Sequence, residues 1–153
     1  MTKTPLRLGI VGLGTVGSGV IKMLSKNATL LSARAGRQII VSAVSARSRS
    51  KERGIDLSGI DWEDSPVALA KRDDVDVLVE LMGGSEGPAK DATLAAISTG
   101  KDVITANKAL LAIHGQSLAL AAEKAGQVIR FEAAVAGGIP VVKALTEGLA
   151  GNK

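Results

Sequence analysis

The chain has 153 residues, of which 46% are hydrophobic and 22% are charged, with a formal net charge of +4 and no cysteine. This composition predicts a packed domain and excludes an intrinsically disordered chain, a disulfide scaffold, a thiolate metal site and a cysteine nucleophile. Because no apolar run reaches about 18 residues and the first residues, MTKTPLRLG, are not an apolar signal segment, we expect no membrane partner and a cytoplasmic location.

The first half of the chain alternates predicted strands and helices. Leu6–Val11 is an apolar strand, and a glycine-rich turn leads from it into a helix whose apolar residues recur every three or four positions until Ala35. A second strand, rich in Ile and Val, covers Gln38–Val44, and a basic loop follows it. Further along, Ser65-Pro66 has the residue types of a helix start, with serine as N-cap and proline in the first helical position.

The second half continues the same alternation. Its predicted elements are a strand at Val75–Leu81, a helix from Pro88 to Thr99, a strand at Asp102–Thr105, a helix that Asn107 can cap and that breaks at His114-Gly115 and resumes to Lys124, a strand at Gln127–Ala133, a turn at Gly137-Gly138 and a helix from Pro140. Strands that are apolar on both faces and are followed by helices favour a parallel sheet covered on both sides. We therefore predict the α/β class, with a doubly wound, mostly parallel sheet in one Rossmann-type dinucleotide-binding domain over residues 1–153.

The segment GLGTVG at residues 12–17 fits the pattern G-x-G-x-x-G and lies between a predicted strand and helix, as dinucleotide binding requires. Gly12 permits the tight turn, Gly14 lets the backbone approach a pyrophosphate, and Gly17 lets helix and strand pack closely. The N–H groups and the positive dipole end at the helix start then face the anion. The alternative interpretation is a plain strand-to-helix turn.

The loop after the second predicted strand is basic, with no acidic residue before Glu52. Its basic residues fall within seven positions: Arg47, Arg49, Lys51 and Arg53. NAD-specific folds place a carboxylate there for the ribose hydroxyl, and that carboxylate would repel a 2′-phosphate, whereas an arginine pairs with one. We therefore predict NADP over NAD, with Arg47 as the contact. The alternative is an exposed loop that discriminates neither cofactor.

Candidate residues also follow the later strands. Gly83-Gly84 would let the backbone lie close to a cofactor, although an ordinary loop is equally compatible. Thr105, Asn107 and Lys108 follow the next strand, and Lys108 lies where nicotinamide would sit if the cofactor spans the switch point. A lysine there can stabilise negative charge or relay a proton at a reacting carbonyl, while the alternative is a surface lysine in the first turn of a helix.

The only histidine, His114, precedes a glycine at the predicted helix end, so we interpret it as a structural cap of helix carbonyls. One histidine without cysteines does not make a zinc site. A hard cation held by carbonyl oxygens and one carboxylate stays open at this point.

Two longer segments, VITANKALLAIHG at 103–115 and FEAAVAGGIPVVKAL at 131–145, follow GLGTVG in order, and together they resemble homoserine dehydrogenase over nearly the whole chain. The resemblance implies interconversion of L-homoserine and L-aspartate 4-semialdehyde with NADPH or NADH, on the route to threonine and methionine. It implies cofactor contacts inside the glycine turn at Leu13, Thr15 and Val16, a 2′-phosphate contact at Arg47, and Lys108 at the nicotinamide as one of two catalytic lysines.

The resemblance also implies a structural, sodium-type cation held by one carboxylate and backbone carbonyls, with matching positions at Glu132, Val135, Gly137 and Ile139. The family's chain continues into a substrate-binding and dimerising domain, so the small-molecule substrate would bind through a part missing here and the parent enzyme would be a homo-oligomer. We therefore expect this chain to be a fragment that binds NADP without turnover.

Three other functions remain open. The chain could be a non-catalytic nucleotide-sensing Rossmann module, or the cofactor half of another semialdehyde or sugar oxidoreductase. A nucleic-acid-binding module ranks last, because Trp62 and Phe131 are the only aromatic residues and four bases on one loop form a small patch.

Overall fold

The computed structural model describes residues 3–135, 137 and 139–148. Its centre is a six-stranded sheet in the order β3-β2-β1-β4-β5-β6, in which every neighbouring pair is parallel. The strands are β1 (Leu6–Val11), β2 (Ile39–Ser45), β3 (Asp61–Trp62), β4 (Val77–Glu80), β5 (Asp102–Thr105) and β6 (Ile129–Arg130). The chain order reverses between the neighbours β1 and β4, which confirms the predicted doubly wound α/β sheet and places its switch point there.

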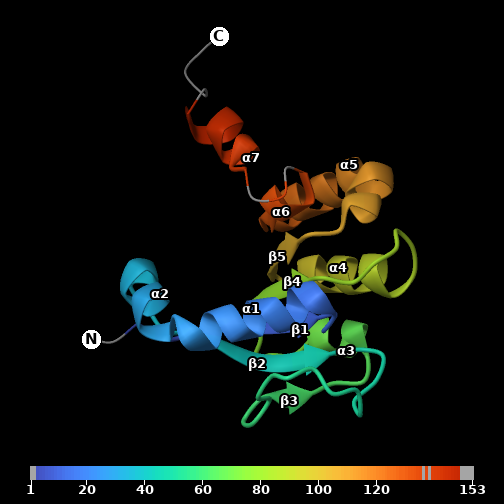
Figure 1. Ribbon diagram of the computed structural model, residues 1–153. Helices are drawn as coiled ribbons and strands as arrows, with labels where there is room; N and C mark the ends of the chain where they lie inside the picture. The colour runs from blue at the N-terminus through green and yellow to red at the C-terminus, as the bar shows by residue number, and fades with distance from the viewer. Residues whose placement is uncertain (1–2, 136, 138, 149–153) are drawn as a thin grey trace.

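Helices connect the strands. They are α1 (Thr15–Lys26), α2 (Ala28–Ala35), α3 (Pro66–Ala70), α4 (Pro88–Ser98), α5 (Lys108–Ala125), α6 (Glu132–Val135) and α7 (Val141–Lys143), followed by a π-helical turn at Ala144–Gly148. Figure 1 shows α7 at the far end of the molecule from β3. Among the described residues, no helix combines the length and apolar character needed to cross a membrane.

The sheet has a hydrophobic core on each face. Along β4, Val77 and Val79 pack in the cluster that contains Ile21 of α1, whereas Leu78 packs in the cluster with residues of α3, α4 and α5. Successive side chains of a strand point to opposite faces, so both faces of this strand are covered. This two-sided burial explains why the central strands are apolar without alternation.

Two helix predictions were wrong in detail. Asn27 adopts φ −112° and ψ 20°, which separates α1 from α2 where we predicted one helix. The predicted break at His114-Gly115 does not occur, since α5 runs from Lys108 to Ala125 without interruption. A glycine inside a helix costs about 1 kcal/mol, and the burial of Leu110, Leu118 and Ala122 on this helix outweighs it.

The strand predictions differ at the edges of the sheet. The predicted strand at Val75–Leu81 is shortened to β4, and that at Gln127–Ala133 to the two residues of β6, because the chain turns into α6 directly afterwards. The two-residue strand β3 was not predicted, since so short a segment has no period to detect. The predicted glycine turn at 137–138 includes Gly138, which lies outside the described residues.

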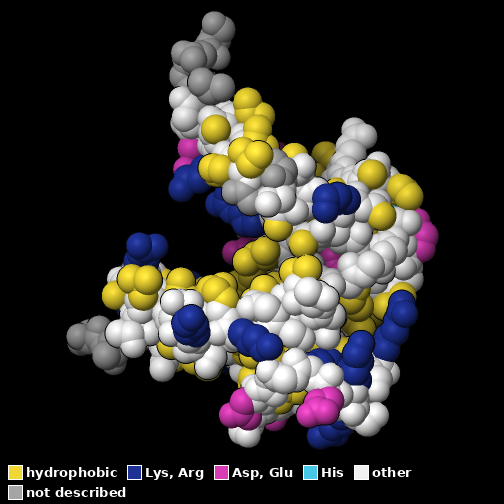
Figure 2. Space-filling view, in the orientation of Figure 1, with side chains coloured by type: hydrophobic (Ala, Val, Ile, Leu, Met, Phe, Trp, Pro, Cys, Tyr) yellow, Lys and Arg dark blue, Asp and Glu magenta, His cyan; other side chains and the backbone are white. Residues whose placement is uncertain are grey.

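Apolar side chains are also exposed on two segments that face each other across a hollow. Figure 2 shows this hollow between α1–α2 and the C-terminal segment, with yellow hydrophobic side chains along both walls. The exposed hydrophobic residues of these segments include Val16, Met23, Leu30, Val135, Ile139 and Leu145. Exposed apolar surface of this extent is typical of an interaction surface.

Candidate functional site

The turn between β1 and α1 needs glycine at two positions for steric reasons. Gly12 has φ +97°, and a Cβ atom there would lie 2.6 Å from the carbonyl carbon and oxygen of Leu81. A Cβ atom on Gly17 would lie 2.0 Å from the carbonyl oxygen of Gly12. The Gly12 N–H donates to the carbonyl of Ser45 over 2.8 Å, which ties the turn to β2. Only glycine therefore lets the turn, α1 and β4 approach this closely.

Gly14 differs from these two glycines, because a Cβ atom there would have no neighbour within 4 Å. It is the N-cap of α1, its backbone is extended, and no side chain caps the helix. The amides of the first turn therefore have no side-chain cap, and no acidic side chain lies in that turn. Such a cradle fits an anion, for example the diphosphate of a dinucleotide.

The side chains inside the turn divide between the core and the open side. Leu13 is buried in the α1 cluster, so its backbone is the part that can lie at the cradle. Thr15 and Val16 are exposed at the start of α1. The three glycines of the turn also differ from one another: Gly12 has a positive φ, Gly14 is open, and Gly17 is enclosed by backbone atoms.

The basic loop after β2 contains two exposed arginines, Arg47 and Arg49, and one anchored arginine, Arg53. Arg47 is exposed, and no hydrogen bond or ion pair is formed by its side chain with any described residue. A hollow of about 680 Å³ is lined by residues 49–57 of the same loop. Arg47 therefore presents a free guanidinium beside the carboxyl end of β2, where the ribose of a dinucleotide lies in this class of sheet.

Arg53 anchors this loop to the glycine turn. Its guanidinium donates to the carbonyl oxygens of Leu13 at 3.1 Å, Lys51 at 2.6 Å and Ser48 at 2.5 Å. It also lies 5.5 Å from the centre of the Trp62 ring, a cation–π distance. One side chain thus joins the diphosphate cradle, the basic loop and β3. No sequence pattern indicates this role, because the contact with Leu13 joins residues 40 positions apart.

The carboxyl ends of β4 and β5 are joined by a buried polar network. Glu80 is fully buried, and its carboxylate accepts from the Thr105 hydroxyl at 2.5 Å and from the Met82 N–H at 2.7 Å. Burial raises the pKa of the Glu80 carboxyl above its usual range, while these hydrogen bonds partly oppose the shift. The Asn107 N–H donates to Thr105 Oγ1 at 3.0 Å and extends the network to the start of α5.

Asn107 links this network to the glycine loop after β4. As predicted, it caps α5: its side-chain oxygen accepts from the Leu110 N–H at 3.1 Å. Its amide nitrogen donates to the carbonyl of Gly84 at 2.7 Å. Gly83 and Gly84 are exposed, and a Cβ atom at either position would have no neighbour within 4 Å. Their backbone is therefore open on one side. Lys108 is exposed and is the first residue of α5, directly after the Asn107 cap.

His114 is not the helix cap that we predicted. It lies inside α5, and its Nε2 atom pairs with a carboxylate oxygen of Glu86 in the loop after β4. This contact and an ion pair with Lys90 hold the pKa of the Glu86 carboxyl below its usual range. The predicted cap depended on a helix end at Gly115, and the uninterrupted helix removes it.

The predicted cation ligands are all described, but they include one acidic side chain only. Glu132 starts α6, and its carboxylate accepts from the Lys143 N–H at 3.5 Å. Val135 and Ile139 are exposed, and among residues 3–135, 137 and 139–148 no three acidic or histidine side chains form a metal cluster. A site built mainly from backbone carbonyls needs no such cluster, so the cation ligands stay a prediction.

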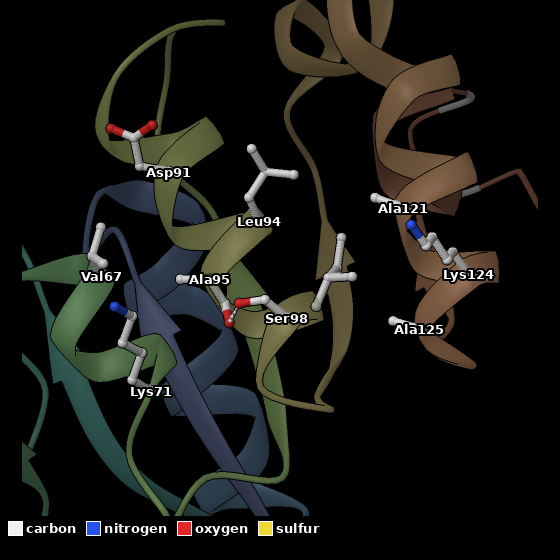
Figure 3. A pocket seen from close by; sticks show the side chains of 10 residues that line it. Val67, Lys71, Asp91, Leu94, Ala95, Ser98, Ala121, Lys124 and Ala125 are labelled. Carbon is white, nitrogen blue, oxygen red and sulfur yellow. Dashed lines mark hydrogen bonds between the residues drawn. The ribbon is translucent and has the colours of Figure 1, made fainter.

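A second concave surface lies away from these residues. Figure 3 shows an apolar groove of about 690 Å³ between Val67 and Lys71 at α3, Leu94 and Ser98 of α4, and the end of α5. None of the site residues predicted from the sequence lines this groove. The candidate site therefore consists of the strand ends and the turn, not of the groove.

Known proteins match this chain over most of its length. Residues 12–132 match the family model described as homoserine dehydrogenase, NAD binding domain. The chain is 50% identical over 149 residues to a homoserine dehydrogenase of Neisseria gonorrhoeae and 44% identical over 149 residues to one of Pseudomonas aeruginosa, in each case over 97% of this chain and 34% of the relative. It thus spans about a third of the length of these relatives.

Solved structures give the same result. The crystal structure of a homoserine dehydrogenase from Thiobacillus denitrificans superposes with a TM-score of 0.88 at 42% identity, over 96% of this chain and 34% of that one. A putative homoserine dehydrogenase from Archaeoglobus fulgidus superposes with a TM-score of 0.78 at 30% identity, over 95% of this chain and 48% of that one.

Proposed function

The chain belongs to the homoserine dehydrogenase family, and from this premise we propose that it is the NADP-binding domain of an enzyme that interconverts L-homoserine and L-aspartate 4-semialdehyde. The observation that carries the proposal is the uncapped amide cradle at Gly14, within a turn whose other two glycines are required by contact. A nicotinamide dinucleotide is the cofactor that the matched family model implies. The reaction would serve threonine and methionine synthesis.

The preference for NADP is supported by the charge of the loop after β2. Arg47 lies two residues beyond the end of the strand, and no carboxylate precedes Glu52 in that loop. A 2′-phosphate would meet an exposed guanidinium there instead of an acid that repels it. A charge-assisted hydrogen bond of about 1.5–3 kcal/mol corresponds to about a ten- to hundredfold gain in affinity.

Lys108 is the residue that we propose for the chemistry. When bound, the nicotinamide cofactor supplies the hydride that reduces the substrate aldehyde. The Lys108 ammonium would stabilise or protonate the oxygen that becomes negative. A cation in the first turn of a helix is electrostatically unfavourable, so its position calls for a compensating role. The buried hydrogen bonds of Thr105 and Asn107 fix the backbone from which this lysine starts.

The remaining proposals concern the rest of the protein. Relatives are about three times as long as this chain, and we propose that substrate contacts and assembly into a homo-oligomer depend on that additional length. The exposed hydrophobic residues on α1–α2 and on the C-terminal segment support such a covered surface. A sodium-type cation at Glu132, Val135, Gly137 and Ile139, the absence of nucleic-acid and membrane partners, and a cytoplasmic location stay predictions.

Titration of the 153-residue chain with NADPH and with NADH tests the proposal. We expect calorimetry to show binding of both, tighter for NADPH, and quenching of the single tryptophan, Trp62, which lies beside the basic loop. Gly14→Ala tests the amide cradle itself, because the added methyl group meets no protein atom but enters the space proposed for the diphosphate. We expect it to keep the fold and to lose at least about tenfold in affinity.

Two results would contradict the proposal. Absence of binding by a folded chain would remove the dinucleotide assignment, and equal affinity for both cofactors would remove the NADP preference. Homoserine oxidation should be negligible with this chain alone, so substantial turnover would show that it holds the substrate residues as well.

A further inference from the structure

Residues 81–87, which follow β4, form a loop that is held to α5 at two separate points. At the first, the Asn107 side chain donates to the Gly84 carbonyl at 2.7 Å. At the second, Glu86 pairs with His114, seven residues further along the chain than Asn107, and the imidazole is only 16% exposed. The loop therefore follows the surface of α5 from its capped end to the middle of its length.

The loop cannot hold this conformation by its backbone alone. Gly84 and Gly87 have φ of +92° and +67°, so two of its residues occupy the left-handed region. Glycine loses more conformational freedom on ordering than any other residue, so contacts with rigid elements must fix such a segment. The hydrogen bond at Gly84 and the pair at Glu86 are the side-chain contacts that join this part of the loop to α5 in the described structure.

The position of the loop gives these contacts a function. It leaves β4, which neighbours β1 at the switch point, and it runs toward α5, whose first residue is Lys108. A dinucleotide in such a sheet lies across the switch point, with its adenosine half toward β2 and its nicotinamide half toward the opposite side. The open backbone at Gly83-Gly84 consequently faces the nicotinamide half rather than the adenosine half.

We propose that His114 is a positioning residue, which through Glu86 holds residues 83–87 in the conformation that receives the nicotinamide half of the cofactor. This inference rests on the proposed function. Lys90 contacts the same Glu86 carboxylate over 3.3 Å, but it lies on α4, directly after the loop, and so makes no connection to α5. The two contacts of the Glu86 carboxylate therefore differ in the elements that they join: the His114 contact joins the loop to α5, and the Lys90 ion pair joins it to α4.

The experiment measures two ligands on the full 153-residue chain. NADPH occupies both halves of the site, whereas adenosine 2′,5′-bisphosphate occupies only the adenosine half. We expect His114→Gln and Glu86→Gln each to weaken NADPH binding about three- to tenfold, the worth of one lost hydrogen bond. Both variants should bind adenosine 2′,5′-bisphosphate like the original chain, a difference that general damage to the fold would not produce.

A double-mutant cycle and a control complete the test. The double variant should bind NADPH no more weakly than either single variant, because both remove the same contact. Lys90→Gln should leave the affinity for both ligands unchanged. Glu86 is exposed, so its variant remains folded and informative if the His114 variant does not fold.

The outcomes separate the inference from the function on which it depends. Unchanged NADPH affinity in Glu86→Gln, equal losses for both ligands, or additive losses in the double variant would overturn the positioning role. Failure of the original chain to bind either ligand would instead contradict the proposed function, and the inference with it.

Discussion

The two sides of the candidate site are built in opposite ways. Beyond β2, Arg47 is exposed and forms no hydrogen bond or ion pair with any described residue, whereas Arg53 of the same loop is anchored to the glycine turn. Beyond β4 and β5, the polar groups are buried and bonded to one another, from Glu80 through Thr105 to Asn107. An exposed charge can select a ligand without supporting the fold, whereas a buried network supports the fold and fixes neighbouring groups. The first side should therefore govern selectivity, and the second geometry and stability.

The glycine turn lies between the two sides, and its substitution should have the largest effect. In Gly17→Ala the new methyl group would overlap the Gly12 carbonyl oxygen, 2.0 Å away, and backbone atoms cannot yield as a side chain can. We expect a loss of about 3 kcal/mol or more in the free energy of unfolding, measured by chemical denaturation. A stable, binding-competent Gly17→Ala chain would show that α1 can shift, and that the turn does not couple the two sides.

Arg47→Gln tests the exposed side. We expect NADPH binding to fall about ten- to hundredfold, NADH binding to stay the same, and the melting temperature to be unchanged. Arg49→Gln is the control, because that guanidinium stacks 6.0 Å from the centre of the Trp62 ring on the same loop. Equal losses for the two cofactors in Arg47→Gln would remove this residue from the 2′-phosphate role.

Glu80→Gln tests the buried side through its pH dependence. Because burial raises the pKa of Glu80 in the folded chain, the stability it contributes is complete below its ordinary pKa, near 4.5, and is lost as pH rises through the raised value. Glutamine does not titrate, so the stability of the original chain relative to the variant should fall with rising pH in that window. Thermal unfolding of both chains, followed from pH 4 to pH 8, measures this difference. A constant difference would mean that Glu80 is not held in a desolvated site.

Asp76→Asn should give the smallest effect, because Asp76 precedes the first residue of β4 and so lies at the end of that strand opposite to the candidate site. Asp76 accepts three hydrogen bonds from Arg7, whose guanidinium holds the pKa of the carboxyl below its usual range. The stability from this pair is present above the ordinary pKa of an aspartate and is lost as pH falls through the lowered value. We expect a small decrease in melting temperature at neutral pH that disappears in acid, with cofactor affinity unchanged. A change in cofactor affinity would show that the Arg7–Asp76 pair also influences the candidate site.

The parts of the site that could be predicted from the sequence are those fixed by neighbours along the chain. The glycines at 12, 14 and 17, the Ser65 cap and the Asn107 cap each depend on a few adjacent residues, and each was predicted in the right place. Lys108 was placed at the start of its helix for the same reason. Residue patterns of this kind can be recognised in the sequence, because they depend on residues a few positions apart.

The contacts that were missed join residues distant in the chain. Arg53 reaches Leu13, and Glu86 reaches His114, across 40 and 28 positions respectively. No local pattern distinguishes Arg53 from the other bases of its loop, or His114 from a helix cap. The wrong break in α5 has the same origin, since only the burial of Leu118 and Ala122 shows why Gly115 does not end the helix.

The strand order also has a consequence for synthesis on the ribosome. β1 and β2 pair early in the chain, but β1 acquires its other neighbour only when β4 has been made, and Lys108 follows later still. A nascent chain that has reached β2 still lacks Leu81, against which the glycine turn packs, so the turn is not complete before β4 has been made. Binding of the whole cofactor would report that translation has passed the start of α5.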